Sequence, residues 1–167
     1  MKGRIKAETN GKRKHRLRDG KRIHRLQNSK QKQKLRNGKR KYTLMSIRRL
    51  KSHEQIQPDR LAKLILRIQK DGMLKKPILV DGKNHVILDG HHRAESLKRL
   101  KLKKIPAILV DYSSRAIKLA SRREKIHVSK HSVIRHALQN QPFPPKTSRH
   151  TFKHELTDAN VQLDLLK

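Results

Sequence analysis

Apolar and polar positions along the chain follow an ordered pattern only from about residue 42 onward. Short apolar runs that are bounded by turn residues or charges are typical of strands. Such runs predict strands at 43–47, 77–80, 85–88, 105–112 and 116–120. The run that starts at 105 is continuously apolar, which is typical of a strand covered on both faces.

Helical spacing predicts three helices among these strands. The first begins at Pro58-Asp59 and ends at Gly72, and its apolar positions follow the i, i+3, i+4, i+7 pattern: Leu61, Leu64, Ile65 and Ile68. The second covers 91–100, with Ala94 and Leu97 on its inner face, and Ser129 caps the third. The pattern therefore predicts a small α+β domain over residues 42–167, a mixed sheet with flanking helices.

Two connections carry recognisable turn chemistry. Asp81-Gly82-Lys83-Asn84 separates two predicted strands, and its Asp-Gly pair is expected to supply the positive dihedrals of a hairpin turn. After the last helix, the prolines at 142, 144 and 145 predict irregular chain until Thr151.

Residues 1–41 have a different amino-acid composition. They hold 18 Lys and Arg against Glu8 and Asp19, with almost nothing apolar, so they cannot form a core and are expected to be a disordered arm when unbound. Asn-Gly-like dipeptides recur every nine residues, a period that fits no heptad. Met45 stands almost where the globular pattern begins, so a physiological start at Met45 is the alternative to a translated arm.

Composition narrows the function classes. The 167 residues carry a formal net charge of +32, which requires anionic partners, nucleic acid being the commonest. Residues 1–41 would supply non-specific contacts to nucleic acid or another polyanion. The chain has no cysteine, which excludes disulfides, thiolate catalysis and cysteine-zinc sites. No apolar run approaches the length of a membrane span, so a cytoplasmic protein without membrane contact is expected.

The segment with the clearest chemistry is Asp89-Gly90-His91-His92-Arg93, between a predicted strand and a predicted helix. Glycine lets the backbone approach a phosphate, and the start of a helix presents free amides and a positive dipole. Arg93 adds a cationic fork. The simpler alternative is that Asp89 or the two histidines only cap the helix.

These residues also carry a family resemblance. The segment ILDGHHRAESLKRLKLKKIPAILVDY resembles the phosphate-binding segment of the ParB/sulfiredoxin-like superfamily. The blocks SHEQIQPDRLAKLILRIQKDGMLKKPILV and PFPPKTSRHTF, on either side of it, look like the free L-serine kinase branch. The resemblance covers about residues 43–167. Sulfiredoxin chemistry itself is excluded, because it needs a thiol.

The resemblance implies a ParB/sulfiredoxin-like fold and a kinase that transfers the terminal phosphate of ADP or ATP, with Mg²⁺, to the hydroxyl of free L-serine. Glu54 would be the catalytic base, and Asp89 a catalytic group or magnesium ligand. The turn would bind the nucleotide phosphates through Gly90, His91, His92 and Arg93. The later block would bind the substrate through Lys146, Thr147, Arg149 and His150.

Other interpretations stay open. Apart from the family, Glu54 reads as an exposed loop acid and 146–150 as a basic polar loop. The chain has no tryptophan where the kinases are associated with an aromatic residue, near 122–124. The main alternative is a ParB-like protein that binds nucleotide and DNA or RNA without kinase activity, although no helix-turn-helix follows Ser129. A nuclease would need clustered acids. The phosphate donor, the acceptor and the existence of a homodimer are not determined by the sequence.

Overall fold

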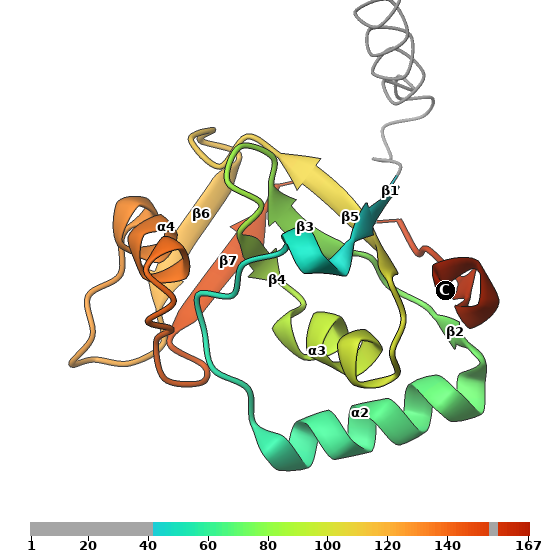
Figure 1. Cartoon of the computed structure of the whole chain (residues 1–167). Coiled ribbons are helices and arrows are strands. Elements are labelled where there is room, and N and C mark those ends of the chain that lie inside the picture. Colours follow the sequence, from blue (N-terminus) through green and yellow to red (C-terminus); the bar gives the residue numbers. More distant parts are fainter. Residues whose placement is uncertain (1–41, 154–156) are drawn as a thin grey trace, which may run out of the picture. The chain divides into compact units, whose positions relative to one another are not determined.

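The computed structural model describes residues 42–153 and 157–167, and Figure 1 shows their arrangement. The predicted arm, residues 1–41, lies outside the described residues. In the part described, strands and helices alternate as an α+β fold, which confirms the predicted fold class. None of the described helices combines the length and the apolar character needed to cross a membrane.

A four-stranded mixed sheet forms the centre of the domain. Its strands lie in the order β1 (Thr43–Ser46), β5 (Lys104–Val110), β3 (Ile78–Asp81) and β4 (Ile87–Asp89). β5 pairs antiparallel with β1 and parallel with β3, and β3 pairs antiparallel with β4. The pairing of β3 with β4 is the hairpin that the sequence predicted. It brings the end of β4, at Asp89, to the start of a helix.

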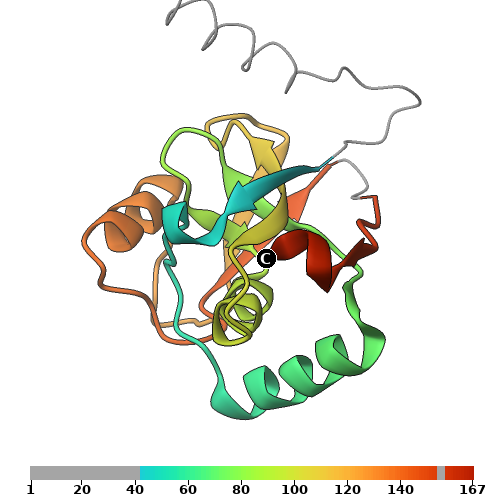
Figure 2. The ribbon, with the colours of Figure 1, turned by 45° about the vertical axis from the view of Figure 1, so that its right-hand side comes forward.

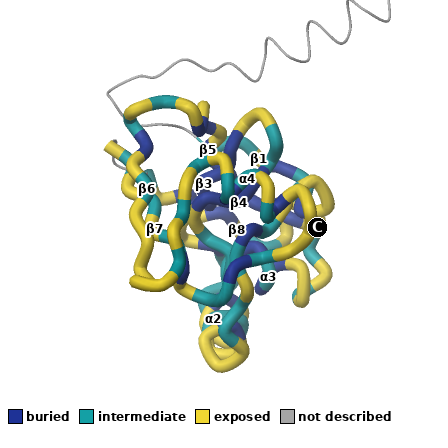
Figure 3. Tube along the Cα trace, turned by 90° about the vertical axis from the view of Figure 1, so that its left-hand side faces the viewer, coloured by how far each residue is buried: buried dark blue, intermediate teal, exposed yellow. Residues whose placement is uncertain are grey.

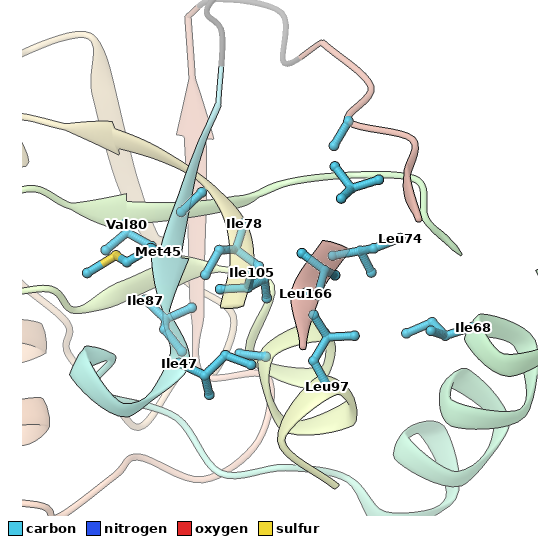
Figure 4. Close-up of a cluster of buried hydrophobic side chains, with 14 residues drawn as sticks. Met45, Ile47, Ile68, Leu74, Ile78, Val80, Ile87, Leu97, Ile105 and Leu166 are labelled. Atoms are coloured by element: carbon cyan, nitrogen blue, oxygen red, sulfur yellow. The ribbon is translucent and has the colours of Figure 1, made fainter. Parts of the chain in front are cut away.

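Apolar layers cover both faces of this sheet, because successive side chains of a strand point to opposite faces. On one face, Ile78, Val80 and Ile105 pack with Leu97 and Leu166 (Figure 4). On the other face, the neighbouring strand positions pack against the α4 side of the domain, in a cluster formed by Leu79, Ile108, Val110, Val133 and Phe143. The continuous apolar run in β5 is thus explained by burial on both sides. Figure 3 shows the buried positions concentrated in these strands.

Two helices lie on the first face and one on the second. α2 (Pro58–Asp71) packs on α3 (His91–Arg99), as Figures 1 and 2 show. α2 ends at Gly72 in the left-handed conformation, as predicted. α4 (Lys130–Leu138) begins with a capping box in which the Ser129 hydroxyl accepts from the amide of Ser132, so the predicted cap is confirmed. Each predicted helix is present within one or two residues of its expected bounds.

Short elements that the sequence did not reveal complete the fold. β2 (Met73–Leu74) pairs with β8 (Val161–Gln162), and the 3₁₀ helices η1 (Ile47–Arg49) and η2 (Leu163–Leu166) close the first core. Two-residue strands and single-turn helices carry too few residues to show a period, so only tertiary contacts identify them.

A separate two-stranded antiparallel sheet pairs β6 (Ile117–Ser121) with β7 (Ser148–Phe152), and α4 lies in the connection between them. The expectation that the prolines keep the chain irregular until Thr151 was wrong, because β7 begins at Ser148. The last proline is Pro145, and Lys146 takes a positive φ of 57° that turns the chain into the strand. Strand pairing with Ser121 then starts at Ser148 itself.

The turn between β3 and β4 also differs from the expectation. Gly82 does not adopt a positive φ, and the left-handed residue is His85, with φ of 58°. The buried Asp81 carboxylate organises the turn instead. It accepts hydrogen bonds from the amides of Lys83 and Asn84, at 3.3 and 2.9 Å, and from the Asn84 side chain at 2.9 Å. A side-chain acceptor of this kind replaces the glycine-dependent turn.

Candidate functional site

A cleft of about 610 Å³ opens beside the junction of β4 and α3. Its walls come from α2, from the β4–α3 turn and from the segment around β7, together with the loop that holds Glu54. The lining residues are Glu54, Arg60, Lys63, Leu64, Arg67, Leu88, Asp89, Gly90, His91, His92, Arg93, Arg122, Lys146, Ser148, Arg149 and His150. Nine of the ten residues expected from the sequence are therefore brought together, and Thr147 is not among them.

The β4–α3 turn has the geometry expected of a phosphate-binding turn. Gly90 is the N-cap of α3 and has a φ of 101°, a conformation that glycine adopts readily and other residues rarely do. No side chain caps the helix, so the suggestion that Asp89 or a histidine serves as the cap was wrong. The first amides of the helix face the same cleft as Arg93, and a helix start of this kind favours anions.

Gly90 is also required by packing, which gives a test of the turn. A Cβ at this position would lie 2.4 Å from Cγ2 of Ile78 in the core. We expect Gly90→Ala to lower the free energy of unfolding by about 3 kcal/mol, combining overpacking with the left-handed penalty. Gly72→Ala is the matched control, because Gly72 has a φ of 63° with nothing within 4 Å of the added carbon. That control should cost about 1 kcal/mol in urea denaturation, and equal losses would contradict the packing argument.

Arg93 is fixed by two partners. Its guanidinium donates to the Asp89 carboxylate at 2.5 Å and to the carbonyl oxygen of Pro77. The Arg93 side chain is 19% exposed and that of Asp89 is 56% exposed. The arginine is thus held rigidly at the cleft, while the carboxylate keeps access to solvent.

Backbone amides of the opposite wall hold Glu54. The amide of Lys146 donates to Oε1 at 2.5 Å, and the amide of Ser148 donates to Oε2 at 3.1 Å. The Ser148 hydroxyl also donates to Oε2, at 2.9 Å. Glu54 itself is placed by an isolated parallel bridge to Phe143, which includes a 2.9 Å bond from the amide of Gln55 to the Phe143 carbonyl. Glu54 is therefore an oriented acid of the cleft wall and not a freely solvated loop residue.

Behind Glu54 lies a cluster of histidine rings: His53, His91 and His150. The His53 ring centroid is 4.5 Å from that of His91 and 5.5 Å from that of His150. His53 Nδ1 is 2.8 Å from the Ile87 carbonyl oxygen, and His150 Nε2 is 2.7 Å from the Tyr112 hydroxyl. Burial lowers the pKa of His53 to about 4 and that of His150 to about 3, and it lowers the pKa of His91 well below its usual value. All three rings are neutral near pH 7.

His92 has a separate partner. Its Nε2 accepts a hydrogen bond from the amide of Gln57 at 3.1 Å, just before α2. Desolvation, followed by the charge of Arg60, lowers the pKa of His92. The neighbouring histidines His91 and His92 thus point to different partners, as their adjacent helical positions require.

The 146–150 segment is only partly as expected. Lys146, Arg149 and His150 line the cleft. Thr147 is fully buried, and its hydroxyl donates to the Pro144 carbonyl at 2.8 Å, so it shapes the loop without reaching the cleft. Thr147 lies just before β7, and its bond to Pro144 closes the turn that leads into the strand.

Sequence reasoning missed seven lining residues, the polar Arg60, Lys63, Arg67, Arg122 and Ser148 and the apolar Leu64 and Leu88. The first three lie at i, i+3 and i+7 of α2, so they form a stripe next to its apolar face, and the helical period that located the core could have revealed them. Arg122 comes to the cleft because β6 pairs with β7, and its amide donates to the Thr147 carbonyl at 2.8 Å. No sequence spacing predicts that contact.

The charges of the cleft define what it can accept. Seven Lys or Arg side chains line it, against the two carboxylates of Glu54 and Asp89. Such a surplus favours a ligand with several negative charges, such as a nucleotide. Among residues 42–153 and 157–167, no group of three or more His, Cys, Asp or Glu is placed to hold a metal ion.

Known proteins resemble this chain in sequence. An ATP-dependent L-serine kinase from Staphylothermus marinus is 38% identical over 80 residues, which are 46% of this chain and 32% of that protein. A ParB-like protein from Sulfolobus acidocaldarius is 39% identical over 75 residues, which are 45% of this chain and 37% of that protein. An ADP-dependent L-serine kinase from Thermococcus kodakarensis is 33% identical over 79 residues, covering 45% and 33%. The matched segments thus span about a third of these relatives.

The fold also has solved counterparts. A free serine kinase in complex with AMP superposes with a TM-score of 0.68 at 18% sequence identity, covering 81% of this chain and 98% of that chain. A conserved hypothetical protein from Pyrococcus furiosus gives a TM-score of 0.71 at 17% identity, covering 77% and 98%. The model of the ParB N-terminal domain matches residues 24–126, which is more than half of the sequence. The chain therefore belongs to the ParB N-terminal domain family.

Proposed function

We propose that this protein is a nucleotide-dependent kinase that phosphorylates the hydroxyl of free L-serine. The observation that carries the proposal is the pairing of two features in one cleft. A glycine turn at a helix start, with Arg93 beside it, forms one wall. A carboxylate oriented by two backbone amides, Glu54, stands in the other. The first suits phosphates, and the second suits removal of a proton from a hydroxyl.

The proposed reaction uses these groups in a simple order. Glu54 takes the proton of the serine hydroxyl while the oxygen attacks the terminal phosphorus of ATP or ADP, and the shortened nucleotide leaves. The amides at the start of α3 and the Arg93 guanidinium stabilise the charge on the phosphate oxygens. Lys146 and Arg149, which line the cleft, would hold the serine carboxylate, and His150 would close the wall beside them. Positioning and charge neutralisation supply most of the rate.

Magnesium fits this arrangement as an ion carried by the nucleotide. Mg²⁺ keeps several waters and takes only one or two protein carboxylates alongside phosphate oxygens. Asp89, half-exposed at the end of β4, is the carboxylate that would contact such an ion. The ion would neutralise phosphate charge, and Arg93 would keep Asp89 oriented.

Relatives support this assignment over a bare nucleotide-binding function. Two of the matched proteins are named as ATP- and ADP-dependent L-serine kinases, and a solved free serine kinase of the same fold binds AMP. ATP or ADP and free L-serine are therefore the proposed partners, in the cytoplasm, where all are abundant. The second candidate function is that of a ParB-like protein that binds nucleotide but does not transfer phosphate. Its partner would be nucleic acid, which the net charge of +32 favours.

A donor and acceptor comparison tests the proposal. The protein is incubated with Mg²⁺, either ATP or ADP, and L-serine, L-threonine or L-alanine, and phosphorylated amino acid is quantified by mass spectrometry. We expect O-phosphoserine with at least one donor and no product with L-alanine, which has no hydroxyl. Absence of phosphoserine with both donors, together with measurable nucleotide binding, would support the second candidate.

A further inference from the structure

The hydroxyl of Ser148 lies between two acceptors at equal distance. Ser148 Oγ is 2.9 Å from Oε2 of Glu54 and 2.9 Å from Nε2 of His53. A hydroxyl has a single hydrogen, so it can donate to one of these atoms at a time. Which of them receives the hydrogen depends on the protonation of the two neighbours.

The tautomer of His53 follows from its other nitrogen. Nδ1 is 2.8 Å from the carbonyl oxygen of Ile87, which can only accept, so Nδ1 carries the ring hydrogen. The ring is fully buried and neutral, because burial lowers its pKa to about 4. Nε2 is then an unprotonated acceptor that faces Ser148.

We propose that Ser148 is a positioning residue whose hydroxyl hydrogen lies on Glu54 while Glu54 is ionised and turns to His53 once Glu54 holds the substrate proton. The proposal rests on the kinase function proposed above. Ser148 keeps its own O–H bond throughout. The only proton that changes atoms moves from the serine substrate to Glu54, which later releases it to solvent.

The relative strength of the acceptors drives this switch. A carboxylate accepts hydrogen bonds more strongly than a neutral ring nitrogen, so the hydroxyl orients the ionised Glu54 for catalysis. A protonated carboxyl is a weaker acceptor, and the hydrogen then gains more by bonding His53 Nε2. The heavy atoms need not move, because both acceptors are already at 2.9 Å. A buried imidazole thus supplies the hydrogen-bond partner that the altered Glu54 no longer offers.

The amide of Ser148 does not share this role, since it always donates to Glu54 Oε2, at 3.1 Å. The backbone contact remains in any side-chain variant, which separates the orientation of Glu54 by the main chain from the contribution of the hydroxyl. Ser121 offers a matched control, because it is the partner of Ser148 in the pairing of β6 with β7. The Ser121 hydroxyl donates to the carbonyl oxygens of Arg123 and Ile126, and neither residue lines the cleft.

Steady-state kinetics provide the first arm of the test. We expect Ser148→Ala to lower kcat for phosphoserine formation roughly 10- to 100-fold, the usual effect of losing a hydrogen bond to a charged group. The KM for nucleotide should stay near the wild-type value. Ser148→Thr, which keeps the hydroxyl, should recover most of the rate, and Ser121→Ala should match the wild type. A wild-type kcat in Ser148→Ala, or a threonine variant as slow as alanine, would overturn the proposal.

Imidazole ¹⁵N NMR gives a second arm that does not depend on turnover. Glu54→Gln replaces the carboxylate by a neutral amide, so the Ser148 hydrogen should turn to His53. The His53 Nε2 resonance should then move upfield, as for a nitrogen that accepts a hydrogen bond, and Ser148→Ala in the same background should reverse the shift. An unchanged resonance would refute the switch. If wild-type protein makes no phosphoserine, the kinase proposal fails, and this spectrum still decides where the hydrogen lies.

Discussion

Replacement of Glu54 by glutamine is expected to lower kcat for phosphoserine formation by about 10²- to 10⁴-fold, the range typical of a general base. Glutamine has nearly the same shape, so the amides of Lys146 and Ser148 keep an acceptor nearby. What is lost is the ability to take a proton from the serine hydroxyl. Rates measured at saturating nucleotide and serine isolate this effect from binding.

Two controls sharpen this result. Nucleotide affinity, measured by calorimetry, should be unchanged or slightly tighter in Glu54→Gln, because one negative charge near the phosphates is removed. Glu124→Gln removes an exposed carboxylate that does not line the cleft, and its kcat should equal that of the wild type. A Glu54→Gln enzyme within threefold of wild type, a limit well below the usual effect of a general base, would show that another group takes the proton.

The second large effect is a loss of stability in mild acid. Burial holds the pKa of His53 near 4 and that of His150 near 3, whereas both are near 6.5 in the unfolded chain. The unfolded state therefore binds more protons at pH values below about 6.5, so the free energy of unfolding falls as the pH falls. Above pH 6.5 the rings are neutral in both states and take nothing from the free energy of unfolding. At pH 4 each of the two rings should have lowered that free energy by about 3 kcal/mol.

Denaturant titrations between pH 7.5 and 4 measure this dependence. Losses of this size are a large share of the stability of a small domain, so we expect unfolding near pH 4. His150→Gln removes one of the titrating rings and should flatten the slope by up to about 1.4 kcal/mol per pH unit. A free energy of unfolding that is constant from pH 7 to 4 would mean that the cluster is not neutral in the folded state.

The sequence predicted the larger elements of the fold because they depend on local patterns. The stripe from Leu61 to Ile68 shows α2, and the Gly72 and Ser129 caps set helix ends that the structure confirms. The position of the turn at 81–84 was predicted correctly, but the interaction that stabilises it was not. Its Asp81 carboxylate bonds to backbone amides only because Asp81 is buried there, and burial is a tertiary property.

The candidate site also combines local and tertiary features. The 89–93 turn is one contiguous segment, so the sequence alone predicts its chemistry. The environment of Glu54 is not predicted in this way, because Lys146 and Ser148 lie more than ninety positions away and only the tertiary fold brings them to it. Thr147 and Ser148 look equivalent as hydroxyl residues in the sequence. The fold buries Thr147, with its hydroxyl bonded to the Pro144 carbonyl, and leaves Ser148 in the wall of the cleft.

Phosphate transfer to the hydroxyl of free serine can be tested directly with L-serine labelled with ¹⁸O in that hydroxyl group. The protein is incubated with this serine, Mg²⁺ and ATP or ADP, and the product is analysed by mass spectrometry and ³¹P NMR. We expect O-phosphoserine that retains ¹⁸O in the bridging oxygen, since the hydroxyl attacks phosphorus and its C–O bond stays intact. Phosphoserine without the label, or no phosphoserine with either donor, would contradict it.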